Sequence, residues 1–550
     1  MVNGRKLPVG IQDFEDLRTT GNLYVDKTAY IYRLVTMGKP YFLGRPRRFG
    51  KSLLLSTLKA YFLGKKELFE GLAIANLEKE WIEYPVIYID FNLGSADNLQ
   101  TVQNLLSSIL DRYEHQWGIV ENHDDLPLLV NWLISIFRKG KVKKQGDLSV
   151  RFFNLIETAY EKSGKKVVVL VDEYDKALTH TMDKPETHEE LRTFLKGFYG
   201  VLKGMDYALR FVFLTGVTKF SKVSVFSDLN HLTDISLYDD YAVICGISET
   251  ELINCFEPEI NALAVKIGKT YHDTLGELRK HYNGYHFSEH TEGIYNPYSL
   301  LRTFAEGKIR DYWFETGTPT FLVKMLKNID FDLKNLENDV KIQVRSISDY
   351  TVGSPNPVPL LYQSGYLTIK SYDASFDAFT LGFPNEEVKY GFLNELLPAY
   401  IPKWGLDESF SVIAFVTAVR SGKVNDFMNL LKAYYASISY DLEDNIDKDE
   451  KYFQLIFYLL FTNMGQFIQT EVKCATGRAD AVVKTADSIY VFEFKMGVSH
   501  PLGKAAEEAL QQIDAKGYLI PYIADERRIV KIGVEFSKVE RGIKRWVSKG

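Results

Sequence analysis

Two carboxylates and a lysine near the C-terminal end of the sequence could together hydrolyse a phosphodiester bond. In the stretch 488–495, alternation with a period of two places Glu493 and Lys495 on one face of a strand. If residues 479–484 pair with this strand as a hairpin, Asp480 lies directly opposite Glu493. Opposed like charges are destabilising unless a cation lies between them, so the pattern predicts a magnesium site. The metal would polarise the phosphoryl oxygen and activate a water, which Lys495 would orient.

Acidic and basic residues alternate on many exposed strands, so the pattern E-x-K alone is weak evidence for a catalytic site. The Gly-Arg-Ala turn before Asp480 and a helix further along the chain strengthen the catalytic interpretation. Because the spacing supplies two metal-binding carboxylates and a cation together, we favour a nuclease-type site over a solvated strand.

A second group of residues has the chemistry of a nucleotide site. Residues 43–53 read LGRPRRFGKSL, and their second half matches the phosphate-binding pattern G-x-x-x-x-G-K-[ST]. Gly50 would let the backbone approach a phosphate, Lys51 would reach the terminal phosphates, and Ser52 would bind magnesium. The first glycine of the pattern is missing, because Arg45 stands five residues before Gly50. Since G-K-S also occurs at ordinary helix starts, a second element is needed to decide.

That second element is the apolar run KVVVLVDEYD at 166–175, a predicted buried strand that ends in two carboxylates. Bare acids in apolar surroundings are costly unless a cation or a water network uses them. In a nucleotide hydrolase, Asp172 would hold the magnesium shell and Glu173 would polarise the attacking water. The alternative, a strand that ends in exposed acids, is disfavoured because both motifs occur in the expected order.

Strand-like and helical segments alternate through the first part of the chain and could position these groups. Apolar runs at 40–44, 86–91, 166–175 and 210–216 alternate with helical stretches such as 51–64, 148–161 and 187–203. Continuous apolar runs between helices predict a parallel sheet that is covered on both faces. We therefore predict an α/β domain over residues 1–245.

The later parts of the chain have different patterns. Residues 246–400 read as a helical region, in which 360–383 has the helix, strand, strand order of a winged-helix lid. Helices recur at 407–438, and the charged stretch 441–451 reads as an exposed connector. A last α/β domain is predicted over 401–550. Its expected elements are helices at 449–464 and 503–516 and strands at 466–473, 479–484, 488–495 and 529–535.

The composition is that of a folded, multidomain protein. With 550 residues the chain exceeds the roughly 100–200 residues of one domain, and 46% of its residues are hydrophobic. Three cysteines without C-x-x-C spacing support neither a disulfide framework nor a zinc knuckle, which fits a cytoplasmic protein. No run approaches the roughly 18 apolar residues of a membrane span. The net charge is −6, but residues 471–550 carry 14 Lys and Arg against 11 Asp and Glu, so this end is locally basic.

The order of these motifs resembles one known protein architecture. The resemblance is carried by FLGRPRRFGKSLLLSTL, VVVLVDEYDKAL, FVFLTGVTKFSK, HYNGYHF with YNPYSLL, and GRADAVV followed by YVFEFK. Together they are similar to prokaryotic proteins that join an AAA-ATPase-like domain to a C-terminal PD-(D/E)xK nuclease-superfamily domain. The resemblance implies an α/β protein with a P-loop parallel-sheet domain, a helical and winged-helix-like middle, and a restriction-endonuclease-like α/β domain.

The resemblance also implies roles for further residues of the nucleotide site. In the loop, Arg45, Arg47 and Arg48 would supply extra phosphate donors, although pairing with acids on the domain surface is an equal alternative. Thr215, at the end of a strand, would sense the terminal phosphate, unless it is a plain strand-end threonine. The missing glycine puts hydrolysis of the nucleotide in question more than its binding.

Two further residues belong to the expected nuclease site. Glu450 would be another acid on the metal side, or else a helix-start acid that complements the helix dipole. Gln512 would orient substrate or water, or else be an ordinary solvated side chain. The basic tail at 527–549 could meet a phosphate backbone, with Trp546 available for stacking, and a solvated basic helix end is the alternative.

These observations predict an ATP-binding switch coupled to a magnesium-dependent nuclease that acts on DNA in preference to RNA. Manganese could replace magnesium at the nuclease site, a homo-oligomer is compatible with the sequence, and no membrane partner is expected. Two alternatives stay open. One is a regulatory or scaffold protein whose nuclease-like domain binds nucleic acid without cutting it, and the other is a motor-like ATPase.

Overall fold

The computed structural model describes most of the chain and divides it into two compact units. The described residues are 5–38, 40–94, 96–119, 147–219, 232–316, 322–323, 325–326, 336, 340–347, 354, 356–400, 412–437, 450–463, 467–474, 477–497, 504–540 and 542–550. The first unit comprises Met1–Glu315 with Asn338–Val388, and the second comprises Thr316–Glu337 with Lys389–Gly550. The three-domain division expected from the sequence stays a prediction.

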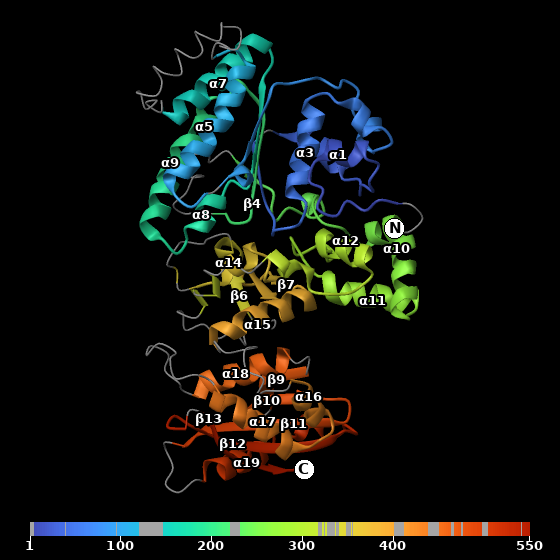
Figure 1. The fold of residues 1–550 in the computed structure, drawn as a ribbon, viewed down its shortest axis with the longest axis vertical. Coiled ribbons are helices and arrows are strands. Elements are labelled where there is room, and N and C mark those ends of the chain that lie inside the picture. The colour runs from blue at the N-terminus through green and yellow to red at the C-terminus, as the bar shows by residue number, and fades with distance from the viewer. Residues whose placement is uncertain are drawn as a thin grey trace, which may run out of the picture. The chain divides into compact units, whose positions relative to one another are not determined.

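A five-stranded parallel sheet lies at the centre of the first unit's N-terminal part (Figure 1). Its strands are β1 (Pro40–Gly44), β2 (Val86–Asp90), β3 (Val167–Asp172), β4 (Leu209–Gly216) and β5 (Thr233–Asp234), in the order β2-β3-β4-β1-β5. The four strands expected from apolar runs are confirmed. Strand β5 was missed, because two residues are too few to produce a recognisable pattern.

Helices cover this sheet on both faces, as a buried parallel sheet requires. Figure 1 shows α1 (Phe14–Thr19) and α3 (Lys51–Phe62) on one side, and α5 (Leu99–Gln116), α7 (Leu148–Ser163) and α9 (Pro185–Gly204) grouped on the other. Shorter helices are α2 (Thr28–Met37), α4 (Ile74–Leu77) and α8 (Lys176–His180). All six side chains of β3 are buried, so the strand that ends in Asp172 runs through the middle of the core.

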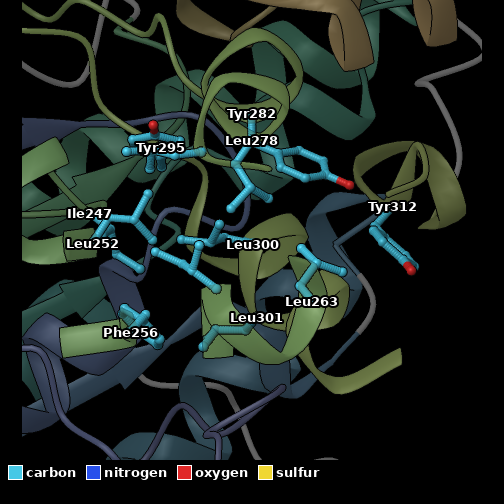
Figure 2. Close-up of a cluster of buried hydrophobic side chains, with 12 residues drawn as sticks. Ile247, Leu252, Phe256, Leu263, Leu278, Tyr282, Tyr295, Leu300, Leu301 and Tyr312 are labelled. Atoms are coloured by element: carbon cyan, nitrogen blue, oxygen red, sulfur yellow. The ribbon is translucent and has the colours of Figure 1, made fainter. Parts of the chain in front are cut away.

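The helical region expected after residue 246 is confirmed. It contains α10 (Glu249–Ile267), α11 (Tyr271–Tyr282) and α12 (Pro297–Glu306). Ser248 and Glu251 form a capping box at the start of α10, which satisfies backbone N–H groups at that helix end. Figure 2 shows the core of this region, in which Leu278, Leu300, Tyr282 and their neighbours pack together.

A small antiparallel sheet completes the first unit. Its strands are β6 (Val340–Gln343), β7 (Thr368–Asp373) and β8 (Ala378–Gly382), in the order β6-β8-β7, and α14 (Val358–Gln363) directly precedes β7. The helix, strand, strand order expected at 360–383 is therefore present, and β6 adds a third strand. Helix α15 (Glu386–Tyr400) follows, and the chain leaves the first unit at Val388 within it.

The second unit is built on a mixed five-stranded sheet. Its strands are β9 (Phe467–Cys474), β10 (Gly477–Lys484), β11 (Ser488–Met496), β12 (Arg528–Ser537) and β13 (Gly542–Lys549), in the order β13-β12-β11-β10-β9. Strands β11 and β12 are parallel, and the other neighbours are antiparallel. Its helices include α16 (Val412–Arg420), α17 (Val424–Ser437), α18 (Glu450–Asn463) and α19 (Ala505–Ala515). The expected strands and helices of this domain are confirmed.

The C-terminal tail differs from its expected structure. The solvated basic helix end considered for it is wrong, because Gly542–Lys549 form strand β13, which pairs with β12. Two of its cations are paired, since Lys544 contacts Glu535 and Arg545 contacts Glu507. Trp546 Nε1 donates a hydrogen bond to Asn425 Oδ1 at 3.3 Å.

The expected charged connector is only partly described. Its positions 441–449 lie outside the described residues, and Glu450 and Lys451 belong to α18. No helix within the described part of the chain combines the length and the apolar character that a membrane crossing needs.

Candidate functional sites

The parallel sheet brings the expected nucleotide-site residues to one edge. Strand β1 is in register with β4, so that Leu43 lies beside Thr215, and β2 is in register with β3, so that Asp90 lies beside Asp172. Because all these strands run in one direction, their carboxyl ends meet at the same edge. The loop that follows β1 therefore lies beside the carboxylates that follow β3, which is where open α/β sheets bind ligands.

The loop after β1 has the shape of a phosphate-binding loop around its final glycine. Gly50 precedes α3 with a φ of 89°, in the left-handed region that glycine adopts at little cost. The buried Lys51 begins the helix, and its Nζ donates to the carbonyl oxygens of Arg45 and Pro46, both at 3.1 Å. The ammonium group is thus held inside the loop, next to the N–H groups at the helix start.

Asp172 is buried and surrounded by hydrogen-bond donors. Its Oδ1 accepts from the Thr215 hydroxyl at 2.8 Å, and its Oδ2 accepts from the Tyr88 hydroxyl at 3.5 Å. Burial raises the pKa of Asp172 above its ordinary value, and hydrogen bonds from Ser52 and Thr215 oppose that shift. The structure therefore brings Ser52, Asp172 and Thr215 together, whereas the sequence analysis did not identify Tyr88.

Glu173 lies beside the loop lysine in a strained backbone conformation. Its φ is 54°, and its Oε1 lies 3.4 Å from Lys51 Nζ. A non-glycine residue with positive φ is uncommon and often marks a functional site. The sequence analysis also passed over Asp175, whose carboxylate accepts the backbone N–H groups of Val217 and Thr218. Burial raises the pKa of Asp175 to about 7.

The three loop arginines have different surroundings, and Arg45 does not have those of a phosphate donor. Its side chain is 1% exposed, and its guanidinium donates to the carbonyls of Ser236 at 2.8 Å and Tyr241 at 3.0 Å. The group also stacks on the ring of Phe287 at 4.0 Å. A guanidinium that is bonded to backbone carbonyls inside the protein holds the loop in shape, so we do not propose Arg45 as a phosphate ligand.

The other two arginines lie nearer the surface. The side chain of Arg47 is exposed. Arg48 is partly buried, with a φ of 67°, and donates from Nη1 to the carbonyl oxygen of Tyr312 at 2.5 Å. The two roles expected of Arg47 and Arg48, phosphate contact and pairing with surface acids, stay predictions.

An apolar cavity of about 100 Å³ adjoins the helix start. It is lined by Pro8, Tyr24, Gly50, Leu53, Ile244 and Leu301, among other residues. Apolar cavities that have a few polar groups at their edge are typical small-molecule sites. A cavity of this kind beside Gly50 could receive the base of a nucleotide whose phosphates lie on the loop.

In the second unit, the predicted hairpin has the predicted register. Ala481 pairs with Phe492, Val482 with Val491 and Lys484 with Ile489, which places Asp480 opposite Glu493 on extension of the ladder. Near that position the side chain of Asp480 also bonds to the neighbouring strand, because its Oδ2 accepts the backbone N–H of Phe494 at 2.7 Å.

Helix α19 places one amide side chain across two of the expected catalytic groups. Lys495 Nζ donates to Gln512 Oε1 at 2.8 Å, and Gln512 Nε2 donates to Glu493 Oε1. The opposite face of β11 packs its aromatic side chains against α18, where Phe457 contacts Phe492 and Phe494. The period-two interpretation of this strand is therefore confirmed, with the polar pair on the α19 side.

The electrostatics of this site fit a bound cation. Glu493 is 4% exposed, and within the described part of the chain its buried Oε2 has no hydrogen-bond partner. Burial raises the pKa of Glu493 to about 8, with Asp480 and Glu450 acting in the same direction and Lys495 in the opposite one. A buried carboxylate oxygen without a partner is costly unless an ion satisfies it. Two neighbouring carboxylates fit magnesium, which keeps several waters and needs few protein ligands.

Glu450 lies at the start of α18, where its Oε1 accepts from Gln454 Nε2 at 3.3 Å. The charge of Glu450 acts in the direction that raises the pKa of Glu493. Within the described residues, no group of three or more acidic, histidine or cysteine side chains forms a ready metal cage. The role of Glu450 as a metal-side acid stays a prediction, as does its alternative role at the helix start.

Two segments of the chain match known protein families. The family described as "Predicted AAA-ATPase" matches residues 8–226, and the "PD-(D/E)XK nuclease superfamily" matches residues 448–546. An "Uncharacterized protein in vnfD 5'region" of Azotobacter chroococcum mcd 1 is 36% identical over 553 residues, which cover 98% of each chain. The chain belongs to the prokaryotic AAA-ATPase and PD-(D/E)XK nuclease family. This family member therefore has a nucleotide-binding, AAA-ATPase-like domain and a nuclease-like domain.

In the nuclease-like domain of this AAA-ATPase and PD-(D/E)XK protein, a glycine that belongs to no motif brings α19 close to the sheet. Gly533 on β12 lies beside Glu493 in the sheet, and the backbone of α19 packs directly on it. A Cβ at this position would lie 2.1 Å from the carbonyl oxygen of Ala506 and 2.6 Å from the amide nitrogen of Leu510. Only glycine lets the helix approach closely enough for Gln512 to reach both Glu493 and the neighbouring lysine.

Proposed function

We propose that the protein is an ATP-binding switch coupled to a magnesium-dependent nuclease that cleaves DNA. The observation that carries the nuclease half is the Gln512 amide that joins Glu493 to Lys495 beside Asp480. Burial makes this acid pair costly, and a bound cation would offset that cost. We place the protein in the cytoplasm, since Cys245 and Cys255 are free thiols.

The side chains divide the work of phosphodiester cleavage. A divalent metal, held by Asp480 and Glu493, would polarise the phosphoryl oxygen and lower the pKa of a bound water. Lys495, fixed at 2.8 Å from Gln512 Oε1, keeps further N–H donors to stabilise charge that develops on the phosphate. Gln512 holds the acid and the lysine in a fixed relation, so that neither must reorganise during the reaction.

The nucleotide half rests on the loop and the groups around it. The helix start and Lys51 would bind the phosphates, Ser52 and Asp172 would hold a magnesium ion, and the apolar cavity beside Gly50 would take the adenine base. Glu173 and Thr215 lie at the same sheet edge, where one would polarise water and the other would contact the terminal phosphate. Hydrolysis of ATP is part of this proposal.

Incubation of the full chain with plasmid, linear and single-stranded DNA tests the nuclease proposal. Each substrate is incubated with magnesium or with EDTA, in the presence and in the absence of ATP. Magnesium-dependent cleavage is expected, with a rate that changes on addition of ATP. If nucleic acid is bound but never cut under any of these conditions, the regulatory or scaffold alternative replaces the nuclease. ATP turnover that rises with nucleic acid and is accompanied by no cleavage would instead favour the motor-like ATPase.

Lys51→Ala is expected to weaken ATP binding about 10- to 100-fold, because hydrogen bonds to charged groups contribute roughly 1.5–3 kcal/mol. Titration calorimetry measures the affinity, and thermal unfolding checks that the domain stays folded. Lys65→Ala is the matched control, because it removes a lysine that follows the end of the same helix and pairs with Glu15, and its ATP affinity is expected to match the wild type. Equal ATP affinity of Lys51→Ala and the wild type would remove the phosphate site.

Gly533→Ala is expected to slow DNA cleavage about tenfold or more, because overpacking of roughly 1–3 kcal/mol pushes α19 and Gln512 away from β11. The measurement is a double-mutant cycle of cleavage rates with Gln512→Ala. If Gly533 acts through Gln512, adding Gly533→Ala to Gln512→Ala causes little further loss. Additive losses would mean that the glycine only supports the fold.

A further inference from the structure

The unusual half of the phosphate loop is held from outside by later parts of the same compact unit. The contacts join Arg45 to Phe287, Arg47 to Trp313, Arg48 to Tyr312 and Tyr298, and Phe49 to Tyr285 and Phe287. Pro46 lies so close to Gly365 that a Cβ added there would come within 2.6 Å of the proline Cβ. Each residue from Arg45 to Phe49 therefore contacts a side chain or backbone group from residues 285–313 or from Gly365.

Two adjacent residues, Tyr312 and Trp313, contact the loop at Arg47 and Arg48. The carbonyl oxygen of Tyr312 accepts from Arg48 Nη1 at 2.5 Å, and Trp313 Nε1 donates to the carbonyl oxygen of Arg47 at 3.4 Å. The guanidinium of Arg48 also lies 3.8 Å from the centre of the Tyr298 ring. Tyr312 itself belongs to the hydrophobic core drawn in Figure 2, so this part of the loop rests on a packed surface.

A buried acid fixes the backbone of these two residues. Glu387 is fully buried, and its Oε1 accepts the backbone N–H of Trp313 at 2.9 Å. Burial raises the pKa of Glu387 to about 8, so the side chain is largely protonated at neutral pH. Burial of the Glu387 carboxyl group is costly, which indicates that a hydrogen-bond acceptor is required at this position.

We propose that Glu387 is a positioning residue of the nucleotide site, acting through the backbone of Tyr312 and Trp313 on the loop before Gly50. The inference rests on the proposed function, because nucleotide affinity is its principal readout. A glycine-rich loop can adopt its shape through backbone freedom, but this loop has Arg45 in place of the first glycine. Its shape therefore depends on contacts supplied by the rest of the unit.

The position of Glu387 in the chain links nucleotide binding at the loop to the start of α15. It lies in the first turn of α15, one residue before the chain leaves the first unit at Val388. A nucleotide that binds more tightly to one arrangement of the loop favours the matching arrangement of the Trp313 and Glu387 contact. The start of the helix that leads into the second unit is thereby sensitive to nucleotide binding.

Glu387→Leu, made in the full chain, is expected to lower ATP affinity about tenfold, because it leaves the buried N–H of Trp313 without an acceptor. Glu387→Gln keeps an amide oxygen at this position and matches the protonated acid in shape, so its affinity stays within about threefold of the wild type. Titration calorimetry at a temperature where every variant is folded measures these affinities.

Leu278→Ala separates positioning from general destabilisation. Leu278 is buried in the core of the same helical region and is absent from the loop contacts described above (Figure 2). This variant is expected to lower the unfolding temperature while leaving ATP affinity unchanged. Equal loss of affinity in Leu278→Ala and Glu387→Leu, or wild-type affinity in Glu387→Leu, would overturn the inference.

Hydrogen exchange at the loop distinguishes failure of this inference from failure of the proposed function. In the absence of nucleotide, Glu387→Leu is expected to exchange the amide hydrogens of Arg45 and residues 47–50 faster than the wild type. Leu278→Ala is expected to leave these exchange rates unchanged. If the wild type binds no ATP, the nucleotide proposal fails, but faster loop exchange in Glu387→Leu still supports the positioning role. Unchanged loop exchange contradicts it.

Discussion

Lys495→Ala is expected to reduce phosphodiester cleavage by about 10²–10³-fold, the usual effect of removing one preorganised charge-stabilising donor. The lysine is held by Gln512 Oε1 at 2.8 Å beside the acid pair, so its charge is in place before the substrate arrives. ATP binding and hydrolysis should stay near wild type, because the two sites lie in different compact units. Initial cleavage rates on plasmid DNA, together with phosphate release from ATP, measure both effects.

Two comparison variants test whether the effect of Lys495→Ala is specific to that lysine. Lys531→Ala removes a cation from the neighbouring strand, where it pairs with Asp514, and is expected to cut at nearly the wild-type rate. Asp480→Asn should also lose cleavage, but through weaker metal binding, so that raised magnesium or manganese partly restores it while Lys495→Ala stays inactive. Wild-type cleavage by Lys495→Ala would refute the nuclease assignment.

Glu173→Gln is expected to slow ATP hydrolysis by about 10²–10⁴-fold, the range in which a positioned general base contributes. Its carboxylate lies 3.4 Å from Lys51 Nζ at the sheet edge where the terminal phosphate would bind. The amide keeps the size of the side chain, so ATP affinity should change only a few-fold. Steady-state turnover at saturating ATP and titration calorimetry measure the two quantities separately.

Asp90→Asn is the matched control for this change. It removes a carboxylate from the same edge of the sheet, where Asp90 accepts the backbone N–H of Asn92. We expect turnover of Asp90→Asn to stay within a few-fold of the wild type. If Glu173→Gln and the wild type hydrolyse ATP equally fast, another group activates the water, or the protein senses ATP without this chemistry.

Much of the framework could be predicted because its signals are local. The strands that end at Gly44 and Asp172 are continuous apolar runs, and a run of that kind is buried wherever it pairs. The hairpin register followed from one turn, since a tight turn and a period of two fix which residues face each other. Asp480, Glu493 and Lys495 could therefore be placed on one site before any tertiary contact was known.

Only the tertiary structure decided the surroundings of each candidate residue. From the sequence, Arg45 could be a phosphate donor or a partner of surface acids, but the folded chain buries its guanidinium among the carbonyls of Ser236 and Tyr241. Gly533 and Glu387 belong to no motif, and each acts on residues that are distant in the chain. The physical reason is that periodicity and turn chemistry report on neighbours in sequence. Helix approach and the burial of a charge depend on segments that meet only after folding.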